Sequence, residues 1–403
     1  MGILEVKGSY LEEDENNVIV HFLLTVASED KELWFSVNKT YKRYLCHERA
    51  DAAVVAFLHY AVMHKLNISS ALPMSRKLHF QLNELLSILC KAAGYKDTPL
   101  YISAPLTDEI YESEGAVGLG MSCGVDALST LYKHSGDSCD EKYKVTHCTY
   151  FNVGAHHGSI GVYNGGDIQR ELFNKQKVSA QRLCMEYNYP LIEVDSNIAD
   201  IQHVKFLYVH TYRNLSVPLL FQKLFAVYYY SSAYPPSKFR ISLTEDSAYY
   251  DILLTSMFST ETLSFYSSCA AMSRLEKVEI LTIFPPAYKH LNVCRKAGNN
   301  CGLCEKCIRT QLELYSMGKL ELFSKSFDID KFYKNKSKIF RHLVRSRNRD
   351  VFMHDIYNSF KEKGIKLPFS IVFFAIVSNV LHCILPKSIR KLIKPLSQRK
   401  KWF

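Results

Sequence analysis

Apolar and polar residues alternate near the N-terminus, over residues 18–24 and 33–37, and this period of two predicts β-strands. Over residues 50–66 apolar residues recur at intervals of three and four, which predicts a helix. Together these patterns indicate an α+β domain over residues 1–112. The charged run at residues 47–51 is interpreted as the solvated start of that helix, with a contact to a substrate or another domain as the alternative.

From Glu114 onward the pattern changes to short apolar runs that alternate with loops and helical segments. We expect strands and intervening helices in this order: strand 116–121, helix 127–134, strand 144–151, helix 170–187 and strand 190–194. Right-handed crossovers between such strands build a parallel, doubly wound sheet of the α/β class. Because ligands bind such sheets beyond the carboxyl ends of the strands, the loops that follow them are candidate binding loops. These loops are 121–126, 152–158 and 195–198.

The composition supports a protein of two or three domains with a substantial core, because 47% of its 403 residues are hydrophobic. The start of the chain lacks the layout of an export signal, so we interpret the twelve cysteines as those of a cytoplasmic protein. The net charge of +10 is concentrated near the end, since residues 330–403 contain 18 Lys and Arg against 4 Asp and Glu. We therefore expect a basic helical tail over 321–403 and no basic groove for nucleic acid across the body.

One apolar run lies within this tail, at residues 368–385, between flanking basic residues. Eighteen residues of helix reach roughly 27 Å, against a hydrocarbon core of about 30 Å. Three interpretations stay open: a buried or partner-docking helix, a helix lying on an anionic membrane surface, or a membrane span. We expect a cytoplasmic location, and peripheral membrane contact through 368–403 stays open. Formation of a homodimer also stays open.

Four cysteines near the end of the second predicted domain have the spacing of a metal site, C-x6-C-x2-C-x2-C. They are Cys294, Cys301, Cys304 and Cys307. Thiolates at this spacing can surround one zinc ion tetrahedrally, and Gly302 and the run 298–300 supply the turns between them. The alternative is unconnected thiols or disulfides. Because four thiolates leave no open coordination position, we expect a structural zinc ion without a catalytic role.

The loop over residues 118–126, Gly-Leu-Gly-Met-Ser-Cys-Gly-Val-Asp, stands between a predicted strand and a predicted helix. Backbone N–H groups in such a glycine-rich turn attract anions, above all phosphate. The spacing of Gly118, Gly120 and Gly124 does not fit the dinucleotide-binding pattern, and no acidic partner for a ribose is found. No Lys-Ser or Lys-Thr pair follows, so the loop is not a Walker A motif either.

Residues 122–127, Ser-Cys-Gly-Val-Asp-Ala, resemble the S-G-G-x-D-S loop of the PP-loop ATP pyrophosphatase superfamily. Four downstream segments resemble, in the same order, the R-N, S-G-Y-P-D, K-x-E and C-G-x-C-x-x-C-x-x-R signatures of 7-cyano-7-deazaguanine synthase. They are 212–214, 247–251, 277–279 and 301–309. The resemblance covers about residues 115–315 and implies an adenine nucleotide alpha hydrolase-like domain over 113–320.

The resemblance also implies an activity and a set of site residues. The enzyme would bind ATP with Mg²⁺, adenylate a deazapurine-like carboxylic acid, release pyrophosphate, and form an amide or nitrile with ammonia or an amine. The implied catalytic residues are Asp126, Lys277 and Arg213. The implied ATP-binding residues are Gly120, Ser122, Cys123, Gly124, Asp126 and Asn152. The implied substrate-binding residues are Arg213, Asn214, Tyr249 and Asp251.

These residues also have structural interpretations. Asp126 would bind Mg²⁺, or would serve only as an acid favoured at a helix N-terminus. Arg213 would pair with a carboxylate or a phosphate, or would form a structural ion pair. Lys277 would neutralise the α-phosphate, or would be a solvated helix residue. His156 and His157 would shuttle protons or merely line their loop.

The chain departs from the resembled family at several positions. Cys123 replaces a glycine, so we expect the loop to open or the thiol to point away from the phosphate. Ala127 replaces a serine, and the hydroxyl lost there would have to come from Ser129. Ile252 replaces a cysteine. With the extra regions at both ends, these departures leave the acid undefined and favour an amide as the product.

The sequence does not identify the amine or the pathway. The amine would be ammonia or belong to a protein or a sugar, and the pathway would be antiviral defence or modification of surface polysaccharide. Two other functions stay open: thiolation or sugar amidation on the same loop, and a non-catalytic nucleotide-binding scaffold attached to a membrane.

Overall fold

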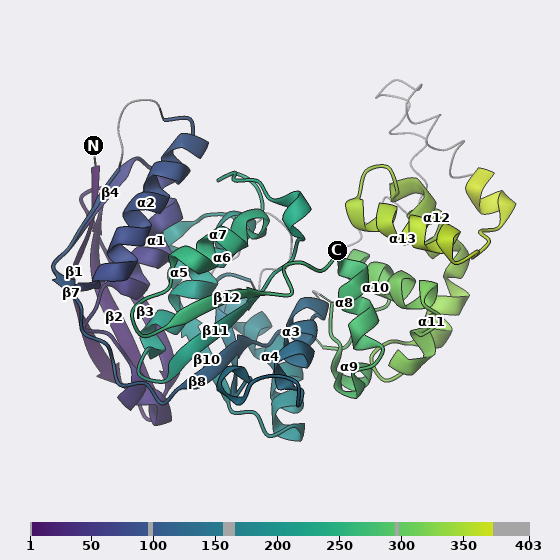
Figure 1. The fold of residues 1–403 in the computed structure, drawn as a ribbon, viewed down its shortest axis with the longest axis horizontal. Helices are drawn as coiled ribbons and strands as arrows, with labels where there is room; N and C mark the ends of the chain where they lie inside the picture. Colours follow the sequence, from purple (N-terminus) through teal and green to yellow (C-terminus); the bar gives the residue numbers. More distant parts are fainter. Residues whose placement is uncertain (1, 96–99, 156–165, 295–297, 374–403) are drawn as a thin grey trace. The chain divides into compact units, whose positions relative to one another are not determined.

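The computed structural model describes residues 2–95, 100–155, 166–294 and 298–373. The chain divides into two compact units, which are treated separately below (Figure 1). The first unit comprises Met1–Ser122 and Asp126–Met272, and the second comprises Cys123–Val125 and Ser273–Phe403. The predicted histidines 156 and 157 and the tail from residue 374 onward lie outside the described residues.

Among the described residues of the first unit, ten strands form one mostly parallel sheet. In sheet order they are β12 (Ser264–Ser268), β11 (Phe225–Ser231), β8 (Ala116–Gly120), β9 (His147–Asn152), β10 (Leu191–Ser196), β3 (Glu29–Asn38), β2 (Asn17–Val26), β1 (Gly2–Glu13), β4 (Leu66–Ser70) and β6 (Ile102–Ser103). A separate two-stranded sheet pairs β5 (Met74–Ser75) with β7 (Leu106–Thr107). The predicted α/β class with a large, mostly parallel sheet is confirmed.

The order of the five strands from β12 to β10 contains a reversal. Strand β8 comes first in the chain, the next two strands add on one side of it, and β11 and β12 add on the other. All pairings among these five strands are parallel. Such a reversal is a topological switch point, beyond whose carboxyl strand ends ligands bind in open α/β sheets. In this unit the switch point lies between β8 and β11.

Seven α-helices and five short 3-10 helices accompany these strands in the described part of the first unit. The α-helices are α1 (Asp51–Met63), α2 (Arg76–Ala92), α3 (Val125–Ser135), α4 (Asp167–Glu186), α5 (Ile198–Gln202), α6 (Phe206–Ser216) and α7 (Asp251–Met257). The 3-10 helices are η1 (Lys39–Tyr44), η2 (Glu141–Tyr143), η3 (Pro218–Phe221), η4 (Pro236–Lys238) and η5 (Ser247–Tyr250). The predicted helix over 50–66 ends at Met63, because Lys65 adopts a positive φ of 56° and Leu66 begins β4.

Helices cover both faces of the parallel strands. Tyr229 of β11 stacks on His134 of α3, whereas the next residue, Tyr230, is hydrogen-bonded to His210 of α6. Since successive side chains of a strand point to opposite faces, α3 and α6 lie on opposite faces of the sheet. This is the doubly wound arrangement, seen in Figure 1 as helices on both sides of the labelled strands.

The N-terminal strands belong to the same sheet as the strands around the switch point. Strand β3 pairs antiparallel with β10, with Val37 opposite Val194 and Phe35 opposite Ser196. Asn197 extends this joint, since its side chain accepts from the Trp34 N–H and donates to the Glu32 carbonyl. The predicted boundary near residue 112 therefore falls inside one compact unit. The division between the two compact units comes near Met272, and the predicted domain over 113–320 stays a prediction.

The second unit is helical in its described residues. Its elements are α8 (Arg274–Leu281), α9 (Pro285–His290), α10 (Glu305–Ser316), η6 (Leu320–Phe323), α11 (Ile329–Lys334), α12 (Lys336–Ser346) and α13 (Val351–Glu362). Helix α12 is amphipathic, burying Phe340 and Leu343 while exposing Lys338 and Arg341. Within the described part of the chain, which ends at Phe373, we find no helix both long and apolar enough to cross a membrane.

A buried carboxyl group connects the N-terminal region to the rest of the first unit. Asp51, at the start of α1, is 1% exposed, and its oxygens accept hydrogen bonds from the Ser75 N–H and the Gln222 side chain. Gln222 in turn accepts from the Thr260 hydroxyl. Burial raises the pKa of Asp51 to about 6, although these two hydrogen bonds and the charge of Arg49 oppose it.

The raised pKa predicts how stability depends on pH. Because the folded protein binds this proton more tightly than the unfolded chain, Asp51 contributes stability below about pH 4 that is lost as the pH rises through 6. Replacing Asp51 with Asn should remove a decline on the order of 3 kcal/mol in the free energy of unfolding between pH 4 and 7. Urea unfolding of both proteins across this range measures the difference.

The matched control is Asp108→Asn, because this exposed carboxylate pairs with Arg76 and its pKa is lowered by that hydrogen bond. The Asp108→Asn protein should keep the wild-type decline in the free energy of unfolding above pH 4. Parallel pH profiles for wild type and Asp51→Asn would contradict the argument.

Candidate functional site

Polar side chains gather at the carboxyl ends of β11 and β12, beside the switch point. Asp251, at the start of α7, is 1% exposed and accepts hydrogen bonds from the Ser232 and Ser267 hydroxyls, each at 3.2 Å. Burial raises the pKa of Tyr230 well above its usual value, and the charges of Asp251, Asp246 and Asp126 raise it further. The structure thus brings Asp126 and Asp251, both predicted site residues, near the end of β11.

The loop after β8 combines exposed and buried residues. Ser122 is exposed and Gly124 and Asp126 are half-buried, whereas Cys123 is completely buried. Cys123 has a φ of 56°, in the left-handed region that favours glycine, the residue found here in the resembled motif. Its thiol is buried in the protein, as one of the two expected outcomes requires. Ser129 is also completely buried, so its hydroxyl is not presented at the loop surface.

Asn152, predicted to contact ATP, holds two strand ends together. Its side chain donates to Asp195 at 2.6 Å and accepts from Gln169 at 3.0 Å, and it is 1% exposed. Arg170 donates to the other oxygen of Asp195 at 3.0 Å. This network orders the carboxyl ends of β9 and β10. Its direct role toward a nucleotide stays a prediction.

Arg213 is 1% exposed and supports the loop that follows β9. Its Nε donates to Gln202 at 2.8 Å, and its Nη1 donates to the Val153 carbonyl at 3.2 Å. Gly154 packs against the same guanidinium with a φ of 107°, and an added Cβ would lie 2.6 Å from Nη1. Only glycine therefore fits this turn. At least two donors of Arg213 are engaged within the protein, and its contact with a substrate stays a prediction.

The other predicted substrate-binding residues lie on α6 and η5. Asn214 donates to the His210 carbonyl one turn earlier on α6. The ring of Tyr249 stacks on Tyr234, with ring centres 4.3 Å apart, and the Arg240 guanidinium lies 3.3 Å from its centre. The ring of Tyr249 is therefore already packed between neighbours, its side chain is also hydrogen-bonded to Tyr234 and Arg240, and its contact with a substrate stays a prediction.

Three residues near this site were not singled out from the sequence. They are His210 on α6, Tyr230 on β11 and Asp246 just before η5, and they form one hydrogen-bonded chain. No local spacing connects them, because each comes from a different element. Two weak signals were present: His210 stands three residues before Arg213, and Asp246 immediately precedes the segment 247–251.

Lys277 belongs to the second unit, on α8, and is completely buried. The interpretation as a solvated helix lysine is therefore wrong. Lysines are rarely buried unless they are paired, so this side chain has a specific role in its unit. Its proposed action on a phosphate stays a prediction.

The four cysteines of the second unit converge as expected for a metal site. Their Sγ atoms all lie within 4.8 Å of one another, with Cys294 and Cys304 at 3.9 Å and Cys301 and Cys307 at 4.0 Å. Zinc bound by four thiolates at about 2.3 Å requires sulfur separations of about 3.8 Å. The hydrogen bonds of Cys294 and Cys304, together with burial, raise the pKa of Cys307 far above that of a free thiol. A cation is what lets such crowded thiols ionise.

Side-chain amides hold the two turns of this metal site. Asn300 accepts from the Val293 and Cys294 N–H groups and donates to the Leu291 and Ser326 carbonyls. In the other turn Gln311 donates to the Gly302 and Cys307 carbonyls. The Cys304 N–H donates to the sulfur of Cys301 at 3.3 Å, a bond suited to a thiolate acceptor. The cluster is therefore a built site that can hold a metal such as zinc.

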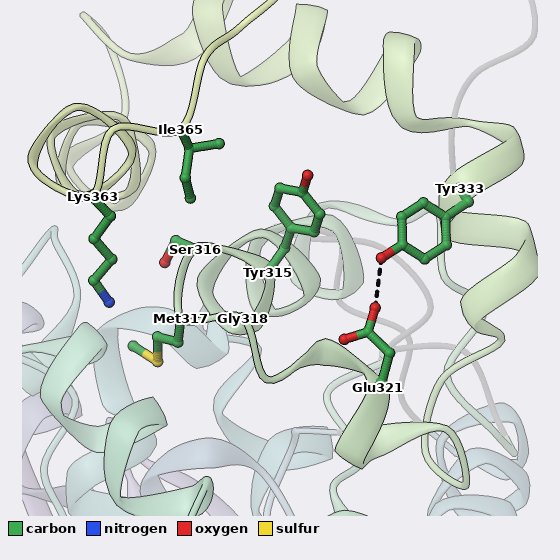
Figure 2. A pocket seen from close by; sticks show the side chains of 8 residues that line it. All are labelled: Tyr315, Ser316, Met317, Gly318, Glu321, Tyr333, Lys363 and Ile365. Atoms are coloured by element: carbon green, nitrogen blue, oxygen red, sulfur yellow. Dashed lines mark hydrogen bonds between the residues drawn. The ribbon is translucent and has the colours of Figure 1, made fainter.

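A shallow groove of about 410 Å³ lies elsewhere in the second unit, and Figure 2 shows the side chains that line it. Tyr333 donates to Glu321 across one side, and this bond raises the pKa of Tyr333 to about 12. Lys363 and Met317 lie on the other side in Figure 2. Its lining contains no cysteine or histidine, and the cysteine cluster is the stronger candidate site in this unit.

Changing Cys304 or Cys307 to serine should release the metal, because serine is a poor ligand at neutral pH and three thiolates cannot close the tetrahedron. Purified wild-type protein should contain about one zinc ion per chain, measured by plasma mass spectrometry, and the variants much less. The unfolding temperature of the variants should fall by roughly 10 °C, because each kcal/mol lost from the free energy of unfolding lowers it by about 2–4 °C.

The control for this experiment is Cys139→Ser, which alters a half-exposed free cysteine outside the cluster. It should keep both the metal and the unfolding temperature. A metal-free wild type, or equal metal content in all three variants and the wild type, would refute the assignment.

Comparison with known proteins gives no family. The chain matches no protein-family model, no curated protein and no solved structure at a significant level. The kinship with 7-cyano-7-deazaguanine synthase therefore stays a resemblance of motifs, and the function must be argued from the site.

Proposed function

We propose that this protein is an ATP-dependent ligase of the PP-loop type, which adenylates a carboxylic acid and transfers the acyl group to ammonia or an amine. The observation that carries the proposal is the position of the loop 122–126. It connects β8 to the N-terminus of α3 at the switch point, where nucleotides bind in doubly wound sheets. The ordered motifs downstream, two of which lie in the first unit, support the same function.

The loop has the properties needed to bind the pyrophosphate part of ATP. Ser122 is exposed and Gly124 is half-buried, and both stand directly before α3, which begins at Val125 and whose dipole favours an anion at this end. Asp126 lies in the first turn of that helix and is half-buried. It would bind Mg²⁺, whose chemistry when bound is to neutralise phosphate charge.

In the proposed reaction a substrate carboxylate attacks the α-phosphorus of ATP and pyrophosphate leaves along the loop. Attack of an amine on the acyl-adenylate then forms the C–N bond and releases AMP. Asp251, held by Ser232 and Ser267, would accept hydrogen bonds from a deazapurine-like acid. Catalysis would depend mainly on positioning and on charge neutralisation.

Replacing Asp126 with Asn should abolish ATP cleavage without unfolding the protein, because the amide keeps the size of the side chain and loses its charge. With ATP, Mg²⁺, 7-carboxy-7-deazaguanine and ammonium chloride, mass spectrometry should detect AMP and an amide from the wild type. We expect the variant to be at least about a hundredfold slower.

Asp137→Asn is the matched control, since Asp137 is an exposed acid just beyond α3. It should react like the wild type. Full pyrophosphate release by Asp126→Asn would contradict the mechanism. AMP formed only with another acid from cell extract would keep the mechanism and change the substrate, and ATP binding without turnover would favour a scaffold.

A further inference from the structure

A chain of three polar side chains lies at the carboxyl end of β11. Asp246 Oδ1 lies 2.8 Å from His210 Nε2, and His210 Nδ1 lies 2.9 Å from the hydroxyl of Tyr230. The side chains of His210 and Asp246 are 16% and 17% exposed, so the chain is shielded but reachable from solvent. It has the order carboxylate, imidazole, hydroxyl, in which a histidine can pass protons to and from the hydroxyl.

The remaining contacts determine the direction of each hydrogen bond. The Asp246 carboxylate also accepts from the Ala248 N–H and from the Tyr234 hydroxyl. Burial raises the pKa of Asp246, but the hydrogen bond and charge of His210, with those other donors, outweigh it and hold the pKa below its usual value. An ionised Asp246 can only accept, so His210 Nε2 carries a proton, and in the uncharged tautomer with that proton Nδ1 accepts from Tyr230.

The surroundings keep Tyr230 protonated and ready to transfer. Burial and the charges of Asp251, Asp246 and Asp126 oppose its ionisation. On the α1 side of α6, His59 packs against Tyr212, and burial lowers the pKa of His59 to about 4, so it adds no charge at neutral pH. With its hydrogen donated to His210, the oxygen of Tyr230 accepts from the Thr211 hydroxyl 3.1 Å away, and its second lone pair can accept another proton.

We propose that Tyr230, His210 and Asp246 form the proton relay of the amine-transfer step, an inference that rests on the proposed function. As the amine nitrogen bonds to the acyl carbon and the bond to AMP breaks, the nitrogen loses a proton to the Tyr230 oxygen. The tyrosine hydrogen passes to His210 Nδ1, and Asp246 stabilises the resulting imidazolium. The proton then leaves to solvent. Tyr230 is the catalytic residue, and His210 and Asp246 are positioning residues.

The relay predicts a separation between the two half-reactions. Pyrophosphate–ATP exchange with 7-carboxy-7-deazaguanine reports adenylation alone, and mass spectrometry of the amide after adding ammonium chloride reports the second step. In Tyr230→Phe, His210→Gln and Asp246→Asn, exchange should stay within about threefold of the wild type. Amide formation should fall by about 10²–10³-fold.

The control is Tyr229→Phe, the neighbouring tyrosine on the opposite face of β11, whose hydroxyl bonds the Tyr143 carbonyl. It should retain both half-reactions. Variants that remain folded by circular dichroism and lose both steps equally, or keep both, would overturn the relay while leaving the ligase proposal in place. A folded wild type that shows no exchange, with this acid or with acids from cell extract, would overturn the ligase and the relay together.

Discussion

The pairing of β8 with both β9 and β11 is the constraint on which the first unit depends. Strand β8 comes first in the chain but lies between the later strands β9 and β11 in the sheet. Right-handed connections to strands on its two sides must therefore run over opposite faces of the sheet. The ring of Tyr228 on β11 lies against Gly118, where an added Cβ would be only 2.6 Å from it. The hydroxyl of Tyr228 is in turn hydrogen-bonded to that of Thr149 on β9, on the other side of β8. These contacts bring the ends of β8 and β11 to the same edge.

The polar residues at that edge are held mainly by one another. Burying a carboxylate or an amide is costly unless its hydrogen bonds are satisfied, by about 1–3 kcal/mol for each group left unpaired. The pairs Asn152–Asp195 and Ser232–Asp251 meet this requirement with partners from different elements. Such mutual support fixes these side chains relative to one another, which is the preorganisation that the proposed function would require.

The sequence predicts the local features of this protein better than the long-range ones. Strands β8–β10 and helices α3 and α4 fall within a few residues of the predicted segments, because each is a short buried run or an amphipathic repeat. The cysteine spacing likewise determines a local cluster. Alternation over residues 33–37 predicts a strand but carries no information about its partner, so the joint of β3 with β10 was not predicted. The same applies to His210, Tyr230 and Asp246, which meet only through the fold.

The departures from the resembled motif at Cys123 and Ala127 affect the buried residues of the loop and not its exposed or half-buried ones. The buried thiol of Cys123 takes a left-handed conformation, at a strain of about 1–2 kcal/mol relative to glycine, and Ala127 is buried as well. Ser122, Gly124 and Asp126, which match the motif, remain accessible. The loop therefore keeps the outward-facing residues of the motif while its packing changes. Under the proposed function, a difference in chemistry from the resembled family is expected among the residues beyond β11, where His210 and Asp246 introduce groups that the motif does not contain.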